Sequence, residues 1–249
     1  MKLPSLLRVR LSQGAPTMAD LGAARPEGFR GLPVLGAGPC PPGCTACVDA
    51  CPSGAITAAP LALDLGRCAF CAECSEACPE GAIDFTSEPR MGATRREDLV
   101  LRAGSAAPTV IASPPLVRLF GRSLRMRQVS AGGCNACELE LNAATNVNFD
   151  VQRYGVEWVA SPRHADALVL TGPLTRTMRD AVRIAWDAMP EPRFLVAVGA
   201  CAISGGLHDG PAADRAFLEE VGPALFVPGC PPHPLTFVNA ILDFVGARR

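Results

Sequence analysis

The chain has 249 residues, enough for one large domain or two small ones with a substantial hydrophobic core. Its formal net charge of −1 argues against the basic surface of a nucleic-acid-binding protein. The longest apolar run, around residues 194–203, is far shorter than the roughly 18 residues that span a bilayer, so we expect a soluble or membrane-peripheral protein.

Cysteine is the residue type that stands out. The twelve cysteines are far above ordinary usage. The first residues show no basic segment followed by an apolar segment and a small-residue cleavage site, so we expect a cytosolic, reducing location. In such a compartment a cysteine framework more often holds metal than disulfides, and the spacing has to decide which metal.

The first half of the chain contains a cysteine-rich repeat. The stretch CVDACPSGAI of residues 47–56 recurs as CSEACPEGAI over residues 74–83. The second copy has the C-x2-C-x2-C-x3-C-P spacing of bacterial two-cluster ferredoxins, in which the fourth cysteine binds the other cluster. We therefore predict two [4Fe-4S] clusters with exchanged ligands, one on Cys40, Cys44, Cys47 and Cys78, and one on Cys68, Cys71, Cys74 and Cys51.

The first copy is irregular, because Cys40 and Cys44 are separated by three residues instead of two. The extra residue of the Pro-Pro-Gly segment can bulge outward without moving the thiolates, so we still expect a [4Fe-4S] cluster there. The alternatives are a [3Fe-4S] cluster at this site or structural zinc for the whole block, since paired C-x2-C motifs also suit tetrahedral zinc.

The second half predicts a different architecture. Short apolar runs rich in β-branched residues alternate with amphipathic stretches such as residues 175–189, and this alternation indicates a parallel sheet covered on both faces. The predicted strands lie in residues 123–131, 165–172, 194–199 and 224–229. We expect an α+β two-[4Fe-4S] ferredoxin-like domain followed by an α/β flavodoxin-like parallel-sheet domain. The expected division is an N-terminal extension (1–35), the ferredoxin domain (36–100), a Pro/Gly/Ser/Ala-rich linker (101–124) and the sheet domain (125–249).

The remaining four cysteines, Cys134, Cys137, Cys201 and Cys230, come from loops that follow predicted strands. In an open parallel sheet, the loops at the carboxyl ends of the strands converge on one crevice. We therefore predict that these four thiolates form one S4 site, which suits zinc or an iron–sulfur cluster. Glycines beside them allow close approach of the backbone, whose N–H groups can donate to cluster sulfurs.

The segments GCNACELELNAATN, MPEPRFLVAVGACAISGG and FVPGCPPHP resemble the small, cluster-carrying subunit shared by group 4 energy-converting [NiFe]-hydrogenases, such as formate hydrogenlyase, and respiratory complex I, where it is the 20 kDa subunit. The resemblance extends from Arg125 to the C-terminus. The first half, with PEGFRGLP at residues 26–33, resembles the two-cluster ferredoxin-like subunit of the same complexes. The sequence therefore looks like a fusion of the two, and the resemblance implies a [4Fe-4S] cluster at the third site.

The resemblance implies an electron-transfer subunit of an oxidoreductase complex. Three [4Fe-4S] clusters would relay electrons between a large catalytic subunit and a low-potential soluble carrier or dehydrogenase. Membrane subunits of the same complex would hold it peripherally on the cytoplasmic face of the cell membrane. The paired C-x2-C motifs that bind nickel–iron in the large subunit are missing here, so we expect no complete active site on this chain.

Two alternatives stay open at the level of function. Complex I subunits usually carry adjacent cysteines at the first ligand motif, whereas two residues separate Cys134 from Cys137, as on the hydrogenase side. A complex I-like module that passes electrons to quinone is the first alternative. A zinc-stabilised adaptor without a redox role is the second.

A few other polar residues near the predicted sites have two interpretations. Glu138 follows a predicted ligand directly and is a candidate for proton transfer in the resembling family, or an exposed carboxylate at a helix start. His164 is a weaker candidate for a proton relay, because a lone loop histidine is usually only a polar contact. His208 and His233 are interpreted as surface residues, since thiolates already complete the ligand sets.

Overall fold

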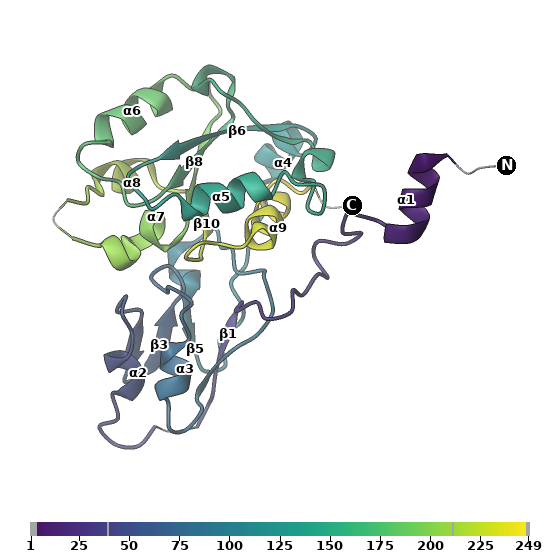
Figure 1. The fold of residues 1–249 in the computed structure, drawn as a ribbon. Helices are drawn as coiled ribbons and strands as arrows, with labels where there is room; N and C mark the ends of the chain where they lie inside the picture. The colour runs from purple at the N-terminus through teal and green to yellow at the C-terminus, as the bar shows by residue number, and fades with distance from the viewer. Residues whose placement is uncertain (1–3, 39, 211, 248–249) are drawn as a thin grey trace.

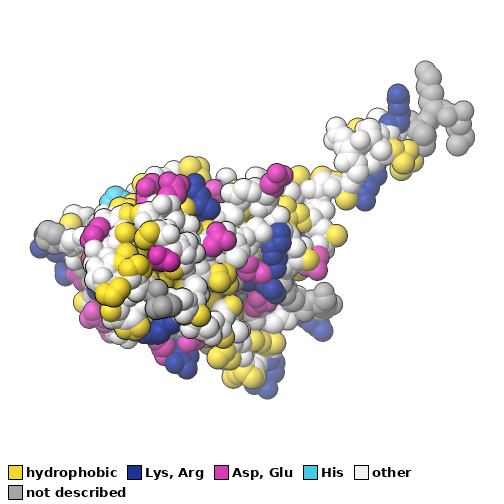
Figure 2. Space-filling model, turned by 90° about the horizontal axis from the view of Figure 1, so that it is seen from below, with side chains coloured by type: hydrophobic (Ala, Val, Ile, Leu, Met, Phe, Trp, Pro, Cys, Tyr) yellow, Lys and Arg dark blue, Asp and Glu magenta, His cyan; other side chains and the backbone are white. Residues whose placement is uncertain are grey.

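The computed structural model describes residues 4–38, 40–210 and 212–247. A small unit of short strands and helices packs against a larger unit built on a parallel sheet (Figure 1). Helix α1 (Ser5–Gln13) buries none of its residues and stands clear of both units in Figure 1 and Figure 2. Within the described residues, no helix has the length and apolar character needed to cross a membrane.

The small unit holds two antiparallel sheets, in which β1 pairs with β4, and β3 lies between β2 and β5. Helices α2 and α3 pack against each other. The short, partly apolar stretches that follow each Cys-Pro pair form β2 and β4. The elements are β1 (Pro33–Leu35), α2 (Ala46–Asp49), β2 (Ile56–Ala58), β3 (Leu61–Asp64), α3 (Glu73–Ala77), β4 (Ile83–Phe85), the 3-10 helix η1 (Arg96–Leu99) and β5 (Val100–Arg102).

The large unit is built on a five-stranded sheet in the order β10-β9-β8-β6-β7, with all strands parallel. The predicted parallel sheet is therefore confirmed, and its order corresponds to a doubly wound arrangement. Strands β8 and β9 are buried at every position, as a sheet covered on both faces requires. The strands are β6 (Leu124–Ser130), β7 (Val156–Trp158), β8 (Ala167–Thr171), β9 (Phe194–Val198) and β10 (Leu225–Val227).

Helices cover both faces of this sheet. On one face, α4, α5 and α9 contribute Phe120, Leu141 and Phe237 to one hydrophobic core. On the other face, Val182 of α6 and Phe217 of α8 belong to a separate core. The helices of this unit are α4 (Pro114–Phe120), α5 (Ala136–Ala143), α6 (Arg179–Asp187), α7 (Ala200–Ser204), α8 (Ala216–Val221) and α9 (Pro234–Phe244), with 3-10 helices η2 (Val151–Tyr154), η3 (Pro162–His164) and η4 (Gly206–His208).

The two units share a hydrophobic core. Leu63 and Leu65 of the small unit belong to the same buried cluster as Ile203 and Phe226 of the large unit. Ala93 and Phe226 also exchange two backbone hydrogen bonds, 3.0 and 2.8 Å long. Because apolar side chains and backbone both cross the boundary, the small unit is fixed on the large one instead of being tethered to it.

The segment expected to be a linker, residues 101–124, is part of this packed structure. It contains the end of β5, all of α4 and the first residue of β6. Phe120 lies in the core, and Ser113 and Pro114 occupy the N-cap and first position of α4, where proline is well tolerated. The expected N-terminal extension, described from residue 4, is also anchored: Leu21 is buried, and its carbonyl oxygen accepts a 3.1 Å hydrogen bond from Asn239.

Phe226→Ala is expected to lower the free energy of unfolding by about 3–5 kcal/mol, because it removes a ring from the core that both units share. Unfolding of the purified chain followed by circular dichroism measures the change. Ile184→Ala is the control, since that side chain is 70% exposed, and it is expected to change stability by less than about 0.5 kcal/mol. A Phe226→Ala protein as stable as the wild type would contradict the shared core.

Candidate functional site

The twelve cysteines fall by their spacing into three predicted ligand sets. They are the first group (Cys40, Cys44, Cys47, Cys78), the second group (Cys51, Cys68, Cys71, Cys74) and the third group (Cys134, Cys137, Cys201, Cys230). All twelve are free thiols, without disulfides. Electrostatic interactions between the thiols show which of them are neighbours, because the Coulomb interaction falls with distance.

In the first group, Cys47 of α2 is close to Cys78 and Cys40. Burial raises the pKa of the Cys47 thiol, backbone N–H groups oppose this, and the negative charges of Cys78 and Cys40 raise it further. Cys44 lies in the loop between Cys40 and α2 and is half-buried. The group thus draws on both copies of the repeat.

In the second group, Cys68 and Cys74 are both buried. Burial raises the pKa of Cys68 to about 12, and the charges of Cys74, Cys51 and Cys71 add to the shift. The pKa of Cys74 is raised to about 11 by burial and then by Cys51 and Cys71. Cys51, which belongs to the first copy in sequence, therefore lies among the thiols of the second copy, as an exchange of ligands requires.

The two Cys-Pro turns have the same local geometry. A backbone N–H four residues later donates to each cysteine sulfur, and a glycine three residues later has positive φ, which glycine adopts without steric cost. The donor pairs are Ala55 to Cys51 and Ala82 to Cys78, both at 3.2 Å. The glycines are Gly54 at φ 60° and Gly81 at φ 58°. The sequence repeat is thus a structural repeat as well.

The irregular start of the first copy keeps one feature of the regular one. Gly43, which precedes Cys44, has φ 75°, and Phe70, which precedes Cys71, has φ 55°. Cys44 and Cys71, the second cysteines of the two cysteine-rich runs, therefore each follow a residue in the left-handed region. The extra residue of the first copy lies before this turn, so the approach to the cysteine is preserved.

The third group gathers at the carboxyl edge of the parallel sheet. Cys134 and Cys137 lie where the chain leaves β6 and enters α5, Cys201 lies in α7 after β9, and Cys230 follows β10. Burial raises the pKa of Cys137 to about 12, and the charges of Glu138, Cys201, Cys230 and Cys134 raise it further. The convergence predicted for these loops is therefore present in the structure.

Glycine allows the close approach that this edge requires. A Cβ atom at Gly199, where φ is 88°, would lie 2.7 Å from the Cys137 sulfur. At Gly229, where φ is 147°, a Cβ atom would lie 2.2 Å from the Cα of Pro232. Any side chain at these two positions would displace the loops that carry the third group.

The second and third groups are neighbours across the boundary between the units. Burial raises the pKa of Cys230, and the charges of Cys134 and of Cys71 raise it further. Cys71 belongs to the small unit and Cys230 to the large one. Cys71 of the second group therefore lies close enough to Cys230 of the third group to disfavour its ionisation.

Glu138 is held in a polar network beside the third group. Thr171 Oγ1 donates to Glu138 Oε1 at 2.6 Å, and Gln128 Nε2 donates to Thr171 Oγ1 at 2.9 Å. Burial opposes ionisation of Glu138, but hydrogen bonds with Ser130 and Thr171 outweigh it and lower its pKa below the usual value. The Glu138 carboxylate is therefore half-buried and hydrogen-bonded, in contrast to the exposed carboxylate that was the alternative interpretation. Its role in proton transfer stays a prediction.

The histidines differ from one another in their surroundings. His164 and His208 are exposed. The interpretation of His233 as a surface residue is wrong: it is half-buried, its Nδ1 accepts a 3.1 Å hydrogen bond from the N–H of Leu235, and its ring lies 4.9 Å from that of Phe29. Burial lowers its pKa. The Pro-His-Pro sequence at the start of α9 was the available signal for a helix cap.

The chemistry of the donors fits iron–sulfur clusters. Each group consists of cysteine thiols alone, and soft thiolate donors suit such clusters. Among the described residues, no set of three or more His, Cys, Asp or Glu side chains is arranged to hold a single metal ion.

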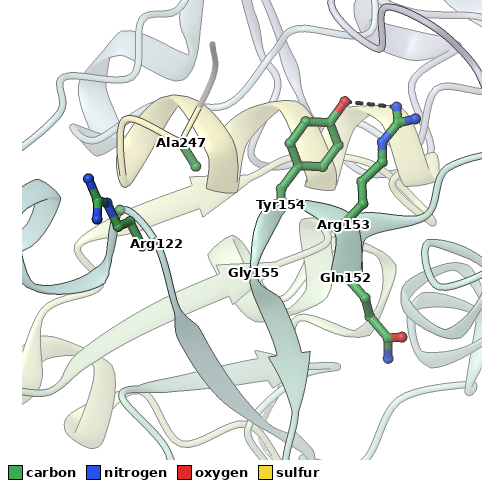
Figure 3. Close-up of a pocket in the computed structure, with 7 residues that line it drawn as sticks. Arg122, Gln152, Arg153, Tyr154, Gly155 and Ala247 are labelled. Carbon is green, nitrogen blue, oxygen red and sulfur yellow. Dashed lines mark hydrogen bonds between the residues drawn. The ribbon is translucent and has the colours of Figure 1, made fainter.

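A cavity of about 640 Å³ lies near the amino-terminal ends of β6 and β7, and Figure 3 shows its lining. Arg153 Nη2 donates to Tyr154 Oη at 2.8 Å, and its guanidinium carbon lies 4.8 Å from the ring centroid. The lining residues are Gly121, Arg122, Gln152, Arg153, Tyr154, Gly155 and Ala247. None of them is a cysteine, so this cavity is separate from the thiol groups.

Comparison with known proteins agrees with this geometry. Residues 134–244 match the family described as NADH ubiquinone oxidoreductase, 20 kDa subunit, and residues 40–82 match a 4Fe-4S dicluster domain. A probable membrane-bound hydrogenase subunit, mbhJ of Pyrococcus furiosus, is 37% identical over 51% of this chain and 77% of its own length. Formate hydrogenlyase subunit 7 of Escherichia coli is 39% identical over 48% of this chain and 47% of its own length. A subunit of the NADH-quinone oxidoreductase of Geotalea daltonii is 34% identical over 47% of this chain and 71% of its own length.

The thiol groups, the dicluster domain and the parallel sheet define an iron–sulfur electron-transfer subunit of the oxidoreductase complexes to which hydrogenases and complex I belong. More particularly, the chain belongs to the family of the 20 kDa subunit of NADH ubiquinone oxidoreductase. In this chain, a 4Fe-4S dicluster domain precedes the part that matches that family. The resemblance inferred from the sequence is thereby confirmed.

Gly199→Ala is expected to lower the iron content of the purified chain, because the new methyl group would displace the Cys137 sulfur and the positive φ would be strained. Iron and acid-labile sulfide per chain are the measurements. Gly210→Ala is the matched control, since a Cβ atom there meets nothing within 4 Å. Equal iron content in both variants would show that close approach at Gly199 is not required.

Proposed function

We propose that this chain relays electrons between a large catalytic subunit and a low-potential carrier, with one [4Fe-4S] cluster bound by each of the three cysteine groups. This corresponds to about twelve iron and twelve sulfide per chain. When bound, such clusters supply one-electron transfer, while the protein sets their spacing and potential. Residues 36–100 act as a ferredoxin-like domain and residues 125–249 as a flavodoxin-like scaffold in this proposal.

The observation that carries the proposal is the proximity of Cys71 and Cys230. Phe70, the residue before Cys71, lines the same cavity as Cys230, and the charges of the two thiols interact across the boundary between the units. This supports a series from the first group through the second to the third. A relay needs such a series, because electron transfer weakens steeply as the distance between centres grows. The shared core of the two units keeps this separation fixed.

The third group is the end of the series that faces the catalytic partner in this proposal. It lies at the carboxyl edge of the sheet, where the loops of a doubly wound fold present their ligands. Cys134 is exposed, and so is the apolar side chain of Leu139 (62%), in the helix α5 that follows it. A protein partner would cover these side chains and exclude water from the cluster edge.

We place a hydrogenase-like large subunit at this edge. The spacing Cys134-x2-Cys137 favours it over a complex I-like partner, and two of the relatives are named as hydrogenase or hydrogenlyase subunits. A complex I-like module that delivers electrons to quinone is the alternative, supported by the similarity to a subunit of NADH-quinone oxidoreductase. In either case the proposal includes membrane subunits and a peripheral location on the cytoplasmic face of the membrane.

Cys51→Ala is expected to damage the cluster of the second group, and Cys78→Ala the cluster of the first group, because each thiol lies among the thiols of the other copy. Electron paramagnetic resonance spectra of the two dithionite-reduced variants, with iron content as the control for loading, measure the effect. Loss of the sequence-local cluster in each variant would show that the ligands are not exchanged.

Cys137→Ser tests the function itself, in the purified complex. It is expected to abolish hydrogen-linked reduction of viologen dyes, while the clusters of the first and second groups remain reducible by dithionite. Undiminished hydrogen-to-dye activity, with the third cluster verified to be missing, would contradict the position next to the catalytic partner. A nickel-free complex with quinone activity would support the complex I-like alternative instead.

A further inference from the structure

The PEGFRGLP segment, residues 26–33, runs between the two cysteine-bearing units, and its Phe29 and Arg30 contact one unit each. Arg30 reaches the small unit. Its Nη1 donates to the carbonyl oxygen of Phe70 at 3.1 Å and to that of Cys71 at 2.5 Å. One guanidinium nitrogen therefore holds two consecutive carbonyl groups of the loop that carries Cys71.

Phe29 reaches the large unit. Its ring centroid lies 4.9 Å from that of His233, and the His233 ring lies 5.8 Å from that of Phe149. His233 is fixed in turn by the hydrogen bond that its Nδ1 accepts from the N–H of Leu235. Since His233 follows Cys230 by three residues, Phe29 packs on the segment that carries a thiol of the third group.

A cavity of about 170 Å³ joins these contacts. Phe29 and Arg30 line it together with Phe70 from the second-group loop and with Cys230 and His233 from the third-group loop. Phe70 directly precedes Cys71, so the cavity lies between a loop that carries a thiol of the second group and one that carries a thiol of the third group. Two adjacent residues of one segment thus fasten the two facing loops.

We propose that Arg30 is a positioning residue for electron transfer between the second and third groups: it anchors the Cys71 loop, and its positive charge raises the reduction potential of the cluster held by the second group. This inference rests on the proposed function, because it assumes that the second group binds a redox-active cluster.

The direction of the effect follows from charge. A reduced cluster carries one more negative charge than an oxidised one, so a nearby cation stabilises the reduced state and raises the potential. Arg30 is exposed, so water and salt weaken the interaction without changing its sign. The effect should be largest at the second group, whose ligand Cys71 has its own carbonyl oxygen bonded to Arg30.

Anchoring is the second part of the effect. Phe70 adopts φ 55°, which is unusual for a residue with an aromatic side chain. Its N–H donates to the Cys68 sulfur at 3.3 Å, so the turn at Phe70 also orients a hydrogen bond to a predicted ligand. By holding the Phe70 and Cys71 carbonyl groups, Arg30 stabilises this turn from a segment forty residues earlier in the chain.

The test compares three variants of the full chain. Arg30→Gln removes the charge, Arg30→Lys keeps it, and Arg25→Gln is the matched control, because Arg25 lies in the same stretch of chain and pairs with Glu88 instead. Redox titrations followed by electron paramagnetic resonance give the midpoint potential of each cluster, with signals assigned through Cys51→Ala and Cys78→Ala. Iron content and melting temperature are measured for each variant.

Arg30→Gln is expected to shift the midpoint of the second-group cluster to a lower potential, with little change for the first group. Arg30→Lys and Arg25→Gln should stay close to the wild type. An unshifted midpoint in Arg30→Gln at full iron content, or the same shift in Arg25→Gln, would overturn the proposal. If Arg30→Gln loses the cluster, Arg30→Lys decides: a wild-type midpoint supports the role of charge, and a lowered one refutes it. A wild-type chain without redox-active clusters would overturn the proposed function instead.

Discussion

The fold has to hold together sulfur atoms that repel one another once they are ionised. Burial raises the pKa of Cys68 and Cys137 to about 12, and the charges of neighbouring thiolates add to the shift in both cases. Such thiols stay protonated until metal binds, and the repulsion between them arises only as they ionise, so each group depends on elements with hydrophobic cores to keep its sulfur atoms together. Metal binding turns the same crowding into an advantage, because coordinated thiols are deprotonated and their charge is balanced by the cations.

The two units meet this constraint in different ways. The small unit uses a repeated local motif, in which α2 and α3 pack together and each Cys-Pro turn directs a backbone N–H to a sulfur. The large unit collects thiols from three loops that are distant in sequence, and the parallel sheet aligns those loops. A buried hydrogen bond from Ser204 to the carbonyl oxygen of Gly66, 2.7 Å long, joins the two arrangements next to their shared core.

Much of this architecture could be predicted from local sequence patterns. The features that could not be predicted depend on contacts between residues that are distant in the sequence. Short runs rich in apolar and β-branched residues indicated β6, β8, β9 and β10, and cysteine spacing indicated neighbours such as Cys51 and Cys74. Strand β7 was missed, because its three residues carry no readable period and its edge position leaves Glu157 exposed. The packing of residues 101–124 and the enclosure of His233 arise from partners elsewhere in the chain, which composition and periodicity do not reveal.

The shared core has a consequence for how such a protein can be divided. If the two units were separate polypeptides, Phe226 and Ile203 on one and Leu63 on the other would face water until the halves met. Each half would carry an adhesive apolar patch, and its pairing would depend on the concentration of the other. In a single polypeptide, that pairing is intramolecular and its stoichiometry is fixed at one to one. The fusion thus provides both units as one prefolded subunit, so that complex assembly does not depend on their bimolecular association.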